Sequence, residues 1–267
     1  MNFQNIPRDD KTVKRAILPK RGSFSFFDYG RIEPYLTAYF AEKIGYPEFA
    51  DQLREGVDAY TAVARLSTGT PSITPKERDV WKRIFLAILY GAGVKRVHEV
   101  WIEETGKVIT MAQAKKIVST FHENWPAVKA LQDRVIATHA ARGYIRTPWG
   151  RNLHAEANGE HKLLNKLIQG SAADLMKWAL LRVDEWLRES GLESRMVSVI
   201  HDEIIFDGPE HEIEILHEEI PRLMRPDFLH NVIPIDVDHE VSVTNWGEKM
   251  SYEEWKEASG RSHNPGT

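Results

Sequence analysis

Apolar and aromatic residues form short runs near both ends of the chain, and these runs predict strands. The run 22–28 alternates toward aromatic side chains, which is typical of a strand. The runs 196–200 and 204–207 predict a β-hairpin, and the run 233–243 predicts a closing strand. We expect the first strand to pair with the hairpin and with the closing strand in one small sheet.

The middle of the chain instead follows the spacing of helices. Residues 32–41 predict a helix, and 75–141 predict a helical region that is interrupted at 91–93 and near Gly106. A long helix is predicted at 161–190. Strands at both ends with helices between them, without strict strand–helix alternation, favour an α+β fold.

Composition excludes several classes of protein. The chain has 267 residues, of which 42% are hydrophobic, enough for a buried core in one or two domains. It has no cysteine, which excludes disulfides, zinc–thiolate sites and iron–sulfur clusters. No apolar run approaches the roughly 20 residues that a membrane span needs, and the first residues lack a signal pattern. We therefore expect a soluble, cytoplasmic protein with no membrane partner.

The net charge of −4 argues against binding of nucleic acid by bulk charge alone. Residues 1–21 predict an extended segment, and basic residues crowd its second half. This local track fits either a phosphate backbone or an ordinary solvated surface. The tail 260–267 contains Gly, Ser and Pro and is predicted to be disordered.

Two aspartates are candidates for chemistry because each ends an apolar run. Asp28 follows the first predicted strand, and Asp202 lies in the predicted turn of the hairpin. Two strand ends side by side in one sheet would bring these carboxylates together, which is unfavourable unless a hard cation sits between them. Two carboxylates that hold two Mg²⁺ ions are the minimal arrangement for in-line phosphoryl transfer.

A stripe of side chains on one predicted helix is the third signal. Arg78, Lys82, Leu86 and Tyr90 recur every four positions, so they drift only ~40° per step and share one face over ~18 Å. The stripe grades from two cations to an aromatic ring, and a nucleoside triphosphate has the matching gradient from phosphates to base. An amphipathic helix with snorkelling basic side chains is the structural alternative.

The long predicted helix carries the fourth signal. Asn165 and Gln169 lie one turn apart, and the small residues 170–173 follow them. Two amides on one face can hydrogen-bond base edges or sugar oxygens, and small residues allow close approach of a large partner. Hydrogen bonding between helices in the core explains the same pattern.

Together the motifs resemble the palm and fingers of a family A DNA polymerase, the DNA polymerase I type. The resemblance runs from Phe3 to Gly247, with the first palm motif at 28–33, the fingers motif at 78–91, a Gln-Gly-Ser-Ala-Ala-Asp segment at 169–174 and the last palm motif at 201–203. It implies an α+β fold with a small antiparallel palm sheet and a mainly helical fingers subdomain. It also implies that a thumb and an exonuclease domain are absent.

The resemblance further implies a division of the chain and an activity. The palm would comprise 1–74, with the first metal aspartate, and 142–259, with the second. The fingers subdomain would comprise 75–141, and the tail 260–267 would lie outside both. The activity would be template-directed DNA synthesis, by two-metal nucleotidyl transfer from a dNTP to the 3′-hydroxyl of a primer–template DNA.

Family roles then follow for individual residues. Asp28, Asp202 and the backbone carbonyl of Tyr29 would hold two Mg²⁺ ions, for which Mn²⁺ can substitute. Arg78 and Lys82 would grip the triphosphate, and Lys82 would also protonate the leaving pyrophosphate.

The other implied roles concern the sugar and the DNA. Tyr90 would pack at the templating position and hydrogen-bond Glu33, which would exclude a ribose 2′-hydroxyl. Leu86 would face the incoming sugar. The residues expected to contact DNA are Asn165, Gln169, His201, Glu203 and Arg151.

Departures from the family pattern limit the transfer. Gly30-Arg31 replaces the usual Ser-Gln, and the partner of the Arg31 cation is left open. Leu86 replaces a usual Phe or Tyr, as in some bacteriophage polymerases. Nothing before Phe3 supplies a thumb or an exonuclease domain. We expect the C-terminal piece of a split polymerase with an N-terminal partner fragment that carries both, in preference to a truncated remnant, at work in a bacterial cell or phage-infected host.

Two other functions compete with this hypothesis. A metal-dependent nuclease could use the same two carboxylates, but it leaves the triphosphate-shaped stripe without a purpose. A non-catalytic DNA- or partner-binding polymerase relic needs no intact site, although Asp28, Lys82 and Asp202 are all retained.

Overall fold

The computed structural model describes residues 11–157 and 159–260, which form two compact units. The first, here called the sheet unit, contains the described residues up to Arg31 together with 175–230 and those from Ile235 onward. The second, the helical unit, contains 32–174 and 231–234. The expected palm and fingers boundaries at 74 and 141 differ from these divisions at 31 and 174. The assignment of palm and fingers stays a prediction.

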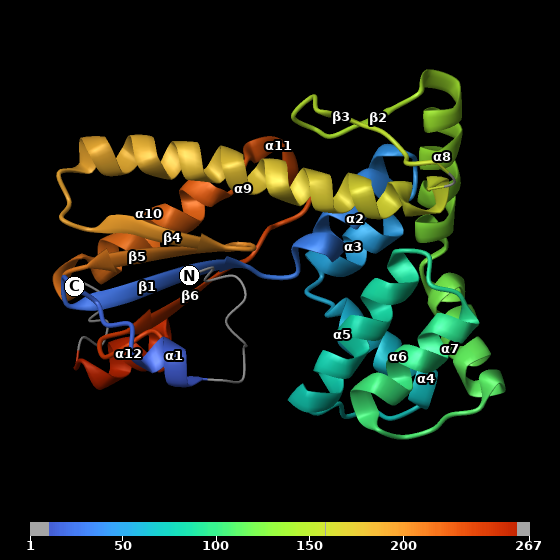
Figure 1. The fold of residues 1–267 in the computed structure, drawn as a ribbon, viewed down its shortest axis with the longest axis horizontal. Coiled ribbons are helices and arrows are strands. Elements are labelled where there is room, and N and C mark those ends of the chain that lie inside the picture. The colour runs from blue at the N-terminus through green and yellow to red at the C-terminus, as the bar shows by residue number, and fades with distance from the viewer. Residues whose placement is uncertain (1–10, 158, 261–267) are drawn as a thin grey trace. The chain divides into compact units, whose positions relative to one another are not determined.

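The sheet unit is built on five antiparallel strands in the order β4-β5-β1-β6-β7 (Figure 1). β1 lies at the centre, and its apolar residues are buried on both faces. The predicted first strand, hairpin and closing strand are all present and pair as expected, which confirms the α+β class. The strands are β1 (Ser23–Tyr29), β4 (Arg195–Ile200), β5 (Glu203–Gly208), β6 (Val237–Ser242) and β7 (Met250–Ser251).

One face of this sheet is an aromatic surface covered by the helix α10 (Ile213–Met224). Phe27 on β1 stacks on His239 of the neighbouring strand, with 4.1 Å between ring centroids. His217 of α10 lies against both His239 and Tyr252, and Tyr252 begins the helix α12 (Tyr252–Ala258). Burial lowers the pKa of His239 well below its ordinary value, so this ring packs as a neutral aromatic.

The opposite face of the sheet changes character along β1. Residues that are directly opposite in an antiparallel pair share a face, so Phe24 and Phe26 stand with Ile205 of β5. These three pack with Trp246 in a buried cluster. Asp28 lies on the same face, two residues beyond Phe26. This face of the sheet is therefore apolar and buried near the start of β1, and it carries a carboxylate near the end of β1.

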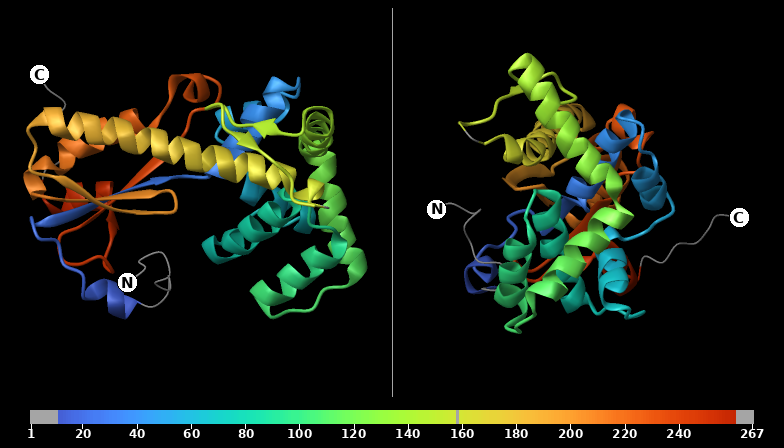
Figure 2. Two further views of the ribbon diagram at one scale, coloured as in Figure 1. Left: turned by 45° about the horizontal axis from the view of Figure 1, so that its top comes forward. Right: turned by 90° about the vertical axis from the view of Figure 1, so that its right-hand side faces the viewer.

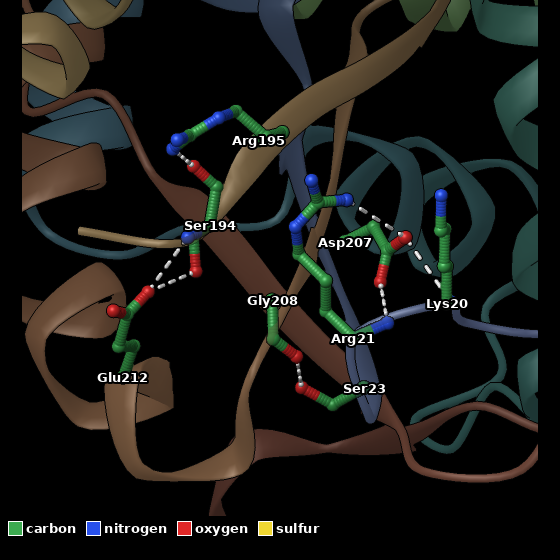
Figure 3. Close-up of polar contacts among 8 residues, drawn as sticks. All are labelled: Lys20, Arg21, Ser23, Ser194, Arg195, Asp207, Gly208 and Glu212. Carbon is green, nitrogen blue, oxygen red and sulfur yellow. Dashed lines mark hydrogen bonds and ion pairs between the residues drawn. The ribbon is translucent and has the colours of Figure 1, made fainter.

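Two buried carboxylates hold the segments that enter β1 and β4 (Figure 3). Asp207 of β5 accepts hydrogen bonds from the backbone N–H groups of Lys20 and Arg21, at 3.1 and 2.9 Å, and so fixes the segment that enters β1. Glu212 accepts bonds from the backbone N–H and the hydroxyl of Ser194, at 2.8 and 2.6 Å, just before β4. In both cases hydrogen bonds from protein N–H and O–H groups take the place of those from water, which a buried charge needs in order to be stable.

The position of Ser194 also explains why residue 208 is a glycine. A Cβ atom at position 208 would lie 1.9 Å from the Ser194 hydroxyl oxygen and 2.9 Å from its Cβ atom. Only glycine fits where these backbones approach so closely.

The helical unit has an aromatic core. Phe85 of α5 contacts Tyr60, Phe121 and Trp125, with ring centroids 5.0 to 5.6 Å apart. α5 begins with a capping box, in which Thr74 and Glu77 satisfy each other's backbone N–H groups. The helices are α2 (Ile32–Lys43), α3 (Glu48–Arg54), α4 (Ala59–Thr68), α5 (Pro75–Leu89), α6 (Val94–Thr105), α7 (Met111–Asn124) and α8 (Pro126–Arg142).

Short elements complete the chain. A two-stranded hairpin follows α8, and a 3₁₀ turn leads into the helix α9. This helix begins in the helical unit and ends in the sheet unit, where it runs beside α10 (Figure 2). The remaining elements are β2 (Ile145–Arg146), β3 (Asn152–Leu153), η2 (Glu160–Lys162), α9 (Leu163–Ser190), η3 (Glu210–Glu212) and α11 (Asp227–His230).

The N-terminal segment differs in part from expectation. Residues 1–10 and 261–267 lie outside the described residues, as does most of the predicted disordered tail. Within 11–21, predicted as extended, α1 (Lys11–Arg15) forms a single helical turn. Across 11–157 and 159–260, no helix has the length and apolar character to cross a membrane.

Candidate active site

A tight turn places Asp202 beside the end of β1. Ile200 pairs with Glu203, so β4 and β5 are joined by only two residues, His201 and Asp202. The exposed His201 takes the left-handed backbone region, with φ of 56°, which is uncommon for a residue other than glycine. The N–H of Tyr29 donates to the carbonyl of Asp202 at 3.3 Å and ties this turn to β1.

Three acidic residues surround Asp28. It lies directly opposite Glu203 on β5 and Asp238 on β6, and its carboxyl shares a hydrogen bond with that of Asp202. Burial, reinforced by the charges of Asp202 and Glu203, raises the pKa of Asp28 from 3.8 to about 8. The Asp28 carboxyl therefore holds its proton more tightly than an exposed aspartic acid does. A cation can take the place of that proton.

The donor chemistry of this cluster fits a hard divalent cation. Its side chains offer carboxylate oxygens, the ligands that Mg²⁺ prefers, and Mg²⁺ commonly takes only one or two carboxylates and completes its shell with water and substrate phosphates. In the described part of the chain, no group of three or more His, Asp or Glu side chains is arranged to hold a metal ion. The pair of aspartates offers two carboxylates, within the number that Mg²⁺ commonly takes.

The charge of Arg31 is paired with a carboxylate outside the pair of Asp28 and Asp202. Its guanidinium forms an ion pair with Asp236, whose backbone carbonyl also accepts the N–H of Gly30 at 3.2 Å. The partner of Arg31, which the sequence analysis left open, is therefore Asp236, and this ion pair stabilises the loop that follows β1.

The predicted stripe lies along one side of α5 in the helical unit. Arg78, Lys82, Leu86 and Tyr90 are all half-buried, and the opposite side of α5, with Trp81, Ile84, Phe85 and Ile88, is buried in the core. Hydrophobic packing of one side of the helix leaves the stripe at the surface of the unit.

The two cations of the stripe lie over one aromatic ring. The Arg78 guanidinium carbon lies 5.1 Å from the centre of the Tyr60 ring, and the Lys82 ammonium lies 5.9 Å from it. Arg78 also forms a forked ion pair with Asp58, the residue that caps α4. Arg78 is therefore held in place before any ligand arrives, whereas the Lys82 ammonium is held only by the ring among the contacts described.

The aromatic end of the stripe faces Glu33. Burial raises the pKa of the Tyr90 hydroxyl, the nearby Glu33 carboxylate raises it further, and the Gln169 side chain lowers it. Burial and Glu33 also raise the pKa of Tyr60. Glu33, Tyr90 and Gln169 thus gather at one place, together with Tyr60, which the sequence analysis missed because no motif marks it.

The other predicted DNA-contacting residues of this unit lie along α9 and the preceding hairpin. Gln169 is exposed, and the Asn165 side-chain oxygen is buried without a hydrogen-bond partner. Arg151 donates to the carboxylate of Asp174 and to the carbonyl of Gly170, the latter at 2.7 Å. Its contact with DNA stays a prediction, and so do those of Asn165 and Gln169.

Glu203 likewise has a partner within the protein. Its carboxylate pairs with Lys249, a residue that the sequence analysis did not single out. The contact of Glu203 with DNA, like that of His201, stays a prediction.

Known proteins are similar to the chain over most of its length. The sequence model of DNA polymerase family A matches residues 1–248. Over 92% of its length, the chain is 29% identical to the DNA polymerase I of Chloroflexus aurantiacus, of which it covers 27%. Over 93% of its length, it is 27% identical to the DNA polymerase I of Geobacillus stearothermophilus, of which it covers 29%.

A solved structure shows the same fold. The POL domain of Pol1 from M. smegmatis, in complex with DNA primer-template and dNTP, matches 92% of this chain with a TM-score of 0.75 at 25% identity. The match covers 44% of that chain. The present chain spans less than a third of the two curated relatives named above.

Proposed function

The chain belongs to DNA polymerase family A, and we propose that it carries out template-directed DNA synthesis on a primer–template with dNTPs. The observation that carries the proposal is the pair of Asp28 and Asp202, pressed together on the sheet with the pKa of Asp28 raised to about 8. Such a pair is costly for a fold and useful for holding cations. We further propose that 1–74 and 142–259 act as the palm and 75–141 as the fingers.

Asp28, Asp202 and the carbonyl of Tyr29 are the residues proposed to hold two Mg²⁺ ions, or Mn²⁺ in their place. When bound, such ions supply Lewis acidity at the primer hydroxyl and neutralise charge on the triphosphate. Asp28 lies on β1 and Asp202 in the turn between β4 and β5, and the N–H of Tyr29 donates to the Asp202 carbonyl, so the backbone fixes their separation before substrate binds. The ions are proposed because the oxygen donors fit them.

The stripe on α5 is proposed to hold the triphosphate. In the reaction the primer 3′-oxygen bonds to the α-phosphorus, the bond from that phosphorus to its bridging oxygen breaks, and pyrophosphate leaves. Arg78 is held by Asp58 and suits a fixed contact with phosphate. Lys82 is proposed to give its proton to the departing pyrophosphate, because an ammonium group can shift its pKa.

Selection of the sugar is assigned to the group around Glu33. Its carboxylate lies close enough to Tyr90 to raise the pKa of that hydroxyl. We propose that Glu33 occupies the space of a ribose 2′-hydroxyl and that Leu86 lies against the sugar. Asn165, Gln169, His201, Glu203 and Arg151 remain the proposed contacts with DNA.

Primer extension by the purified chain with Mg²⁺ and four dNTPs tests the proposal. Asp202→Asn removes one carboxylate charge without changing shape, and we expect it to abolish extension while circular dichroism stays unchanged. Asp184→Asn is the matched control, because Asp184 lies in a surface ion pair with Arg188 on α9 and should matter little. Equal extension by the wild type and Asp202→Asn would refute the site.

A second arm of the experiment concerns a partner. We propose that an N-terminal polymerase fragment with a thumb and an exonuclease domain works with this chain, which covers 27% and 29% of the two relatives named above. Extension that needs such a fragment would support this pairing. No extension in either arm, and no Mg²⁺-dependent binding of dNTP by calorimetry, would leave a non-catalytic relic instead.

A further inference from the structure

Lys249 lies on the acidic face of the sheet, next to the pair of aspartates. Its ammonium nitrogen is 3.8 Å from the centre of the Phe26 ring, and Phe26 is two residues before Asp28 on the same face of β1. From this position it pairs with Glu203 on one neighbouring strand and with Glu240, at 3.2 Å, on the other. One lysine therefore bridges β5 and β6 across the central strand.

The pairing is well shielded from water. The side chains of Lys249 and Glu203 are 22% and 16% exposed, and Phe26 beneath them is buried. An ion pair that is this sheltered is screened less than a surface pair, and removal of one partner leaves an uncompensated charge. Here that charge would be the carboxylate of Glu203, which lies directly opposite Asp28 and follows Asp202 in the chain.

The short strand β7 fixes the position of Lys249 on the sheet. The match to family A ends at residue 248, and Lys249, β7 and α12 follow it. β7 pairs with β6 through Val241 and Met250, so the residue just before Met250 lies at the edge of the sheet. Pairing of β7 with β6 thereby places a cation on the acidic face of the sheet.

We propose that Lys249 is a positioning residue that holds the Glu203 carboxylate away from the Asp28–Asp202 pair, so that only these two carboxylates face the cations. The inference rests on the proposed function, because it presupposes a metal site at that pair. Glu203 lies directly opposite Asp28 on the same face of the sheet, so it is close enough to compete for a cation. Without the lysine, Glu203 becomes a third ligand that binds the ion more tightly and distorts the two-aspartate arrangement.

The test is a titration of the full chain with Mn²⁺, in the absence of DNA and nucleotide. Electron paramagnetic resonance monitors the titration and gives the affinity of the chain for the ion. Lys249→Met keeps the apolar stem over Phe26 and removes the charge, and we expect it to tighten Mn²⁺ binding by about tenfold. We expect the same variant to lower kcat with little change in the KM for dNTP. Lys249→Arg keeps the charge and should restore both values toward the wild type.

The double variant tests whether Glu203 carries the effect. Adding Glu203→Gln to Lys249→Met removes the released carboxylate, and the Mn²⁺ affinity should return close to that of the wild type. Lys256→Met, on α12 and also beyond the family match, is the matched control and should leave Mn²⁺ affinity unchanged. Glu203→Gln alone should weaken Mn²⁺ binding, which gives a reading that does not depend on how well Lys249→Met folds.

If the wild-type chain binds Mn²⁺, the metal site is supported, and three results would then overturn the inference about Lys249. These are unchanged affinity in Lys249→Met, tightening that Glu203→Gln does not reverse, and an equal effect of Lys249→Arg, which would indicate packing in place of charge. If the wild-type chain binds no Mn²⁺, the proposed function fails, and this inference fails with it.

Discussion

Glu212→Gln is the most informative test of how the sheet unit holds the segment that enters β4. The Glu212 carboxylate accepts three hydrogen bonds, from the N–H of Glu193 at 2.8 Å and from the N–H and hydroxyl of Ser194. All three partners are donors. A glutamine can keep its oxygen toward Ser194, but its NH₂ group then faces the N–H of Glu193, where two donors meet.

The magnitude follows from these contacts. Glu212 is 4% exposed, so water does not replace a lost bond. Loss of one bond to a charged acceptor costs about 1.5–3 kcal/mol, and the two that remain weaken because the acceptor is neutral. We therefore expect the free energy of unfolding of the sheet unit to fall by about 2–4 kcal/mol at neutral pH.

The pH dependence has a definite sign. Burial alone would raise the pKa of Glu212, but hydrogen bonds from Ser194 and from the backbone N–H of Glu193 outweigh it and lower the pKa below 4.5. A carboxylate whose pKa is lower in the folded state stabilises the fold above its unfolded pKa. That stability is lost as the pH falls through the folded pKa. The difference between wild type and Glu212→Gln should therefore be full at about pH 7 and shrink toward about pH 3.

Urea unfolding followed by tryptophan fluorescence, at these two pH values, measures the difference. Hydrogen exchange of the Ser194 amide reports the local contact. Glu218→Gln, an exposed glutamate on the same helix, should change stability by no more than about 0.5 kcal/mol. A Glu212→Gln protein as stable as the wild type at neutral pH, or a gap that grows in acid, would refute the reasoning.

Three further changes test the proposed roles and the packing. Glu33→Ala should relax the preference for dNTP over rNTP by about tenfold or more in single-nucleotide incorporation, and an unchanged ratio would count against the sugar gate. Lys82→Ala should lower kcat by about 10²–10⁴ while the Kd for DNA changes little; the reverse would move Lys82 from the triphosphate to the template. Gly208→Ala forces a Cβ atom onto Ser194 and should cost about 1–3 kcal/mol in thermal unfolding. An unaltered midpoint would show that β5 shifts freely.

The elements that were predicted correctly are those with a strong local pattern. β1, the β4–β5 hairpin and α9 each have a run of apolar residues that already contains the spacing of the observed element. The resemblance to family A was confirmed by the match to residues 1–248. Phage origin, suggested by Leu86, stays a prediction.

The elements that were missed are defined by their neighbours. β7 has only two residues, Met250 and Ser251, and becomes a strand through pairing with β6. No periodic pattern exists in so short a segment. Lys249 is one lysine among many in the sequence, and only the sheet shows which acidic residues it meets.

Tyr60 is a comparable case within the proposed site. Its ring is buried beneath two cations, but a lone tyrosine in α4 gives no sign of this in the sequence. Candidate side chains on one helix could be grouped by spacing, since a helix fixes which residues share a face. A residue from another helix enters the group only through tertiary packing.

The central place of β1 in the sheet affects how the protein is made. Both neighbours of β1, β5 and β6, come from the last third of the sequence, whereas β1 is synthesised near the start. A nascent chain that has emerged only through α9 therefore carries an aromatic strand with no partner on either edge. Such long-range pairing folds slowly and leaves a strand exposed to aggregation in the meantime. The central strand can therefore be enclosed in its sheet only after both β5 and β6 have been synthesised.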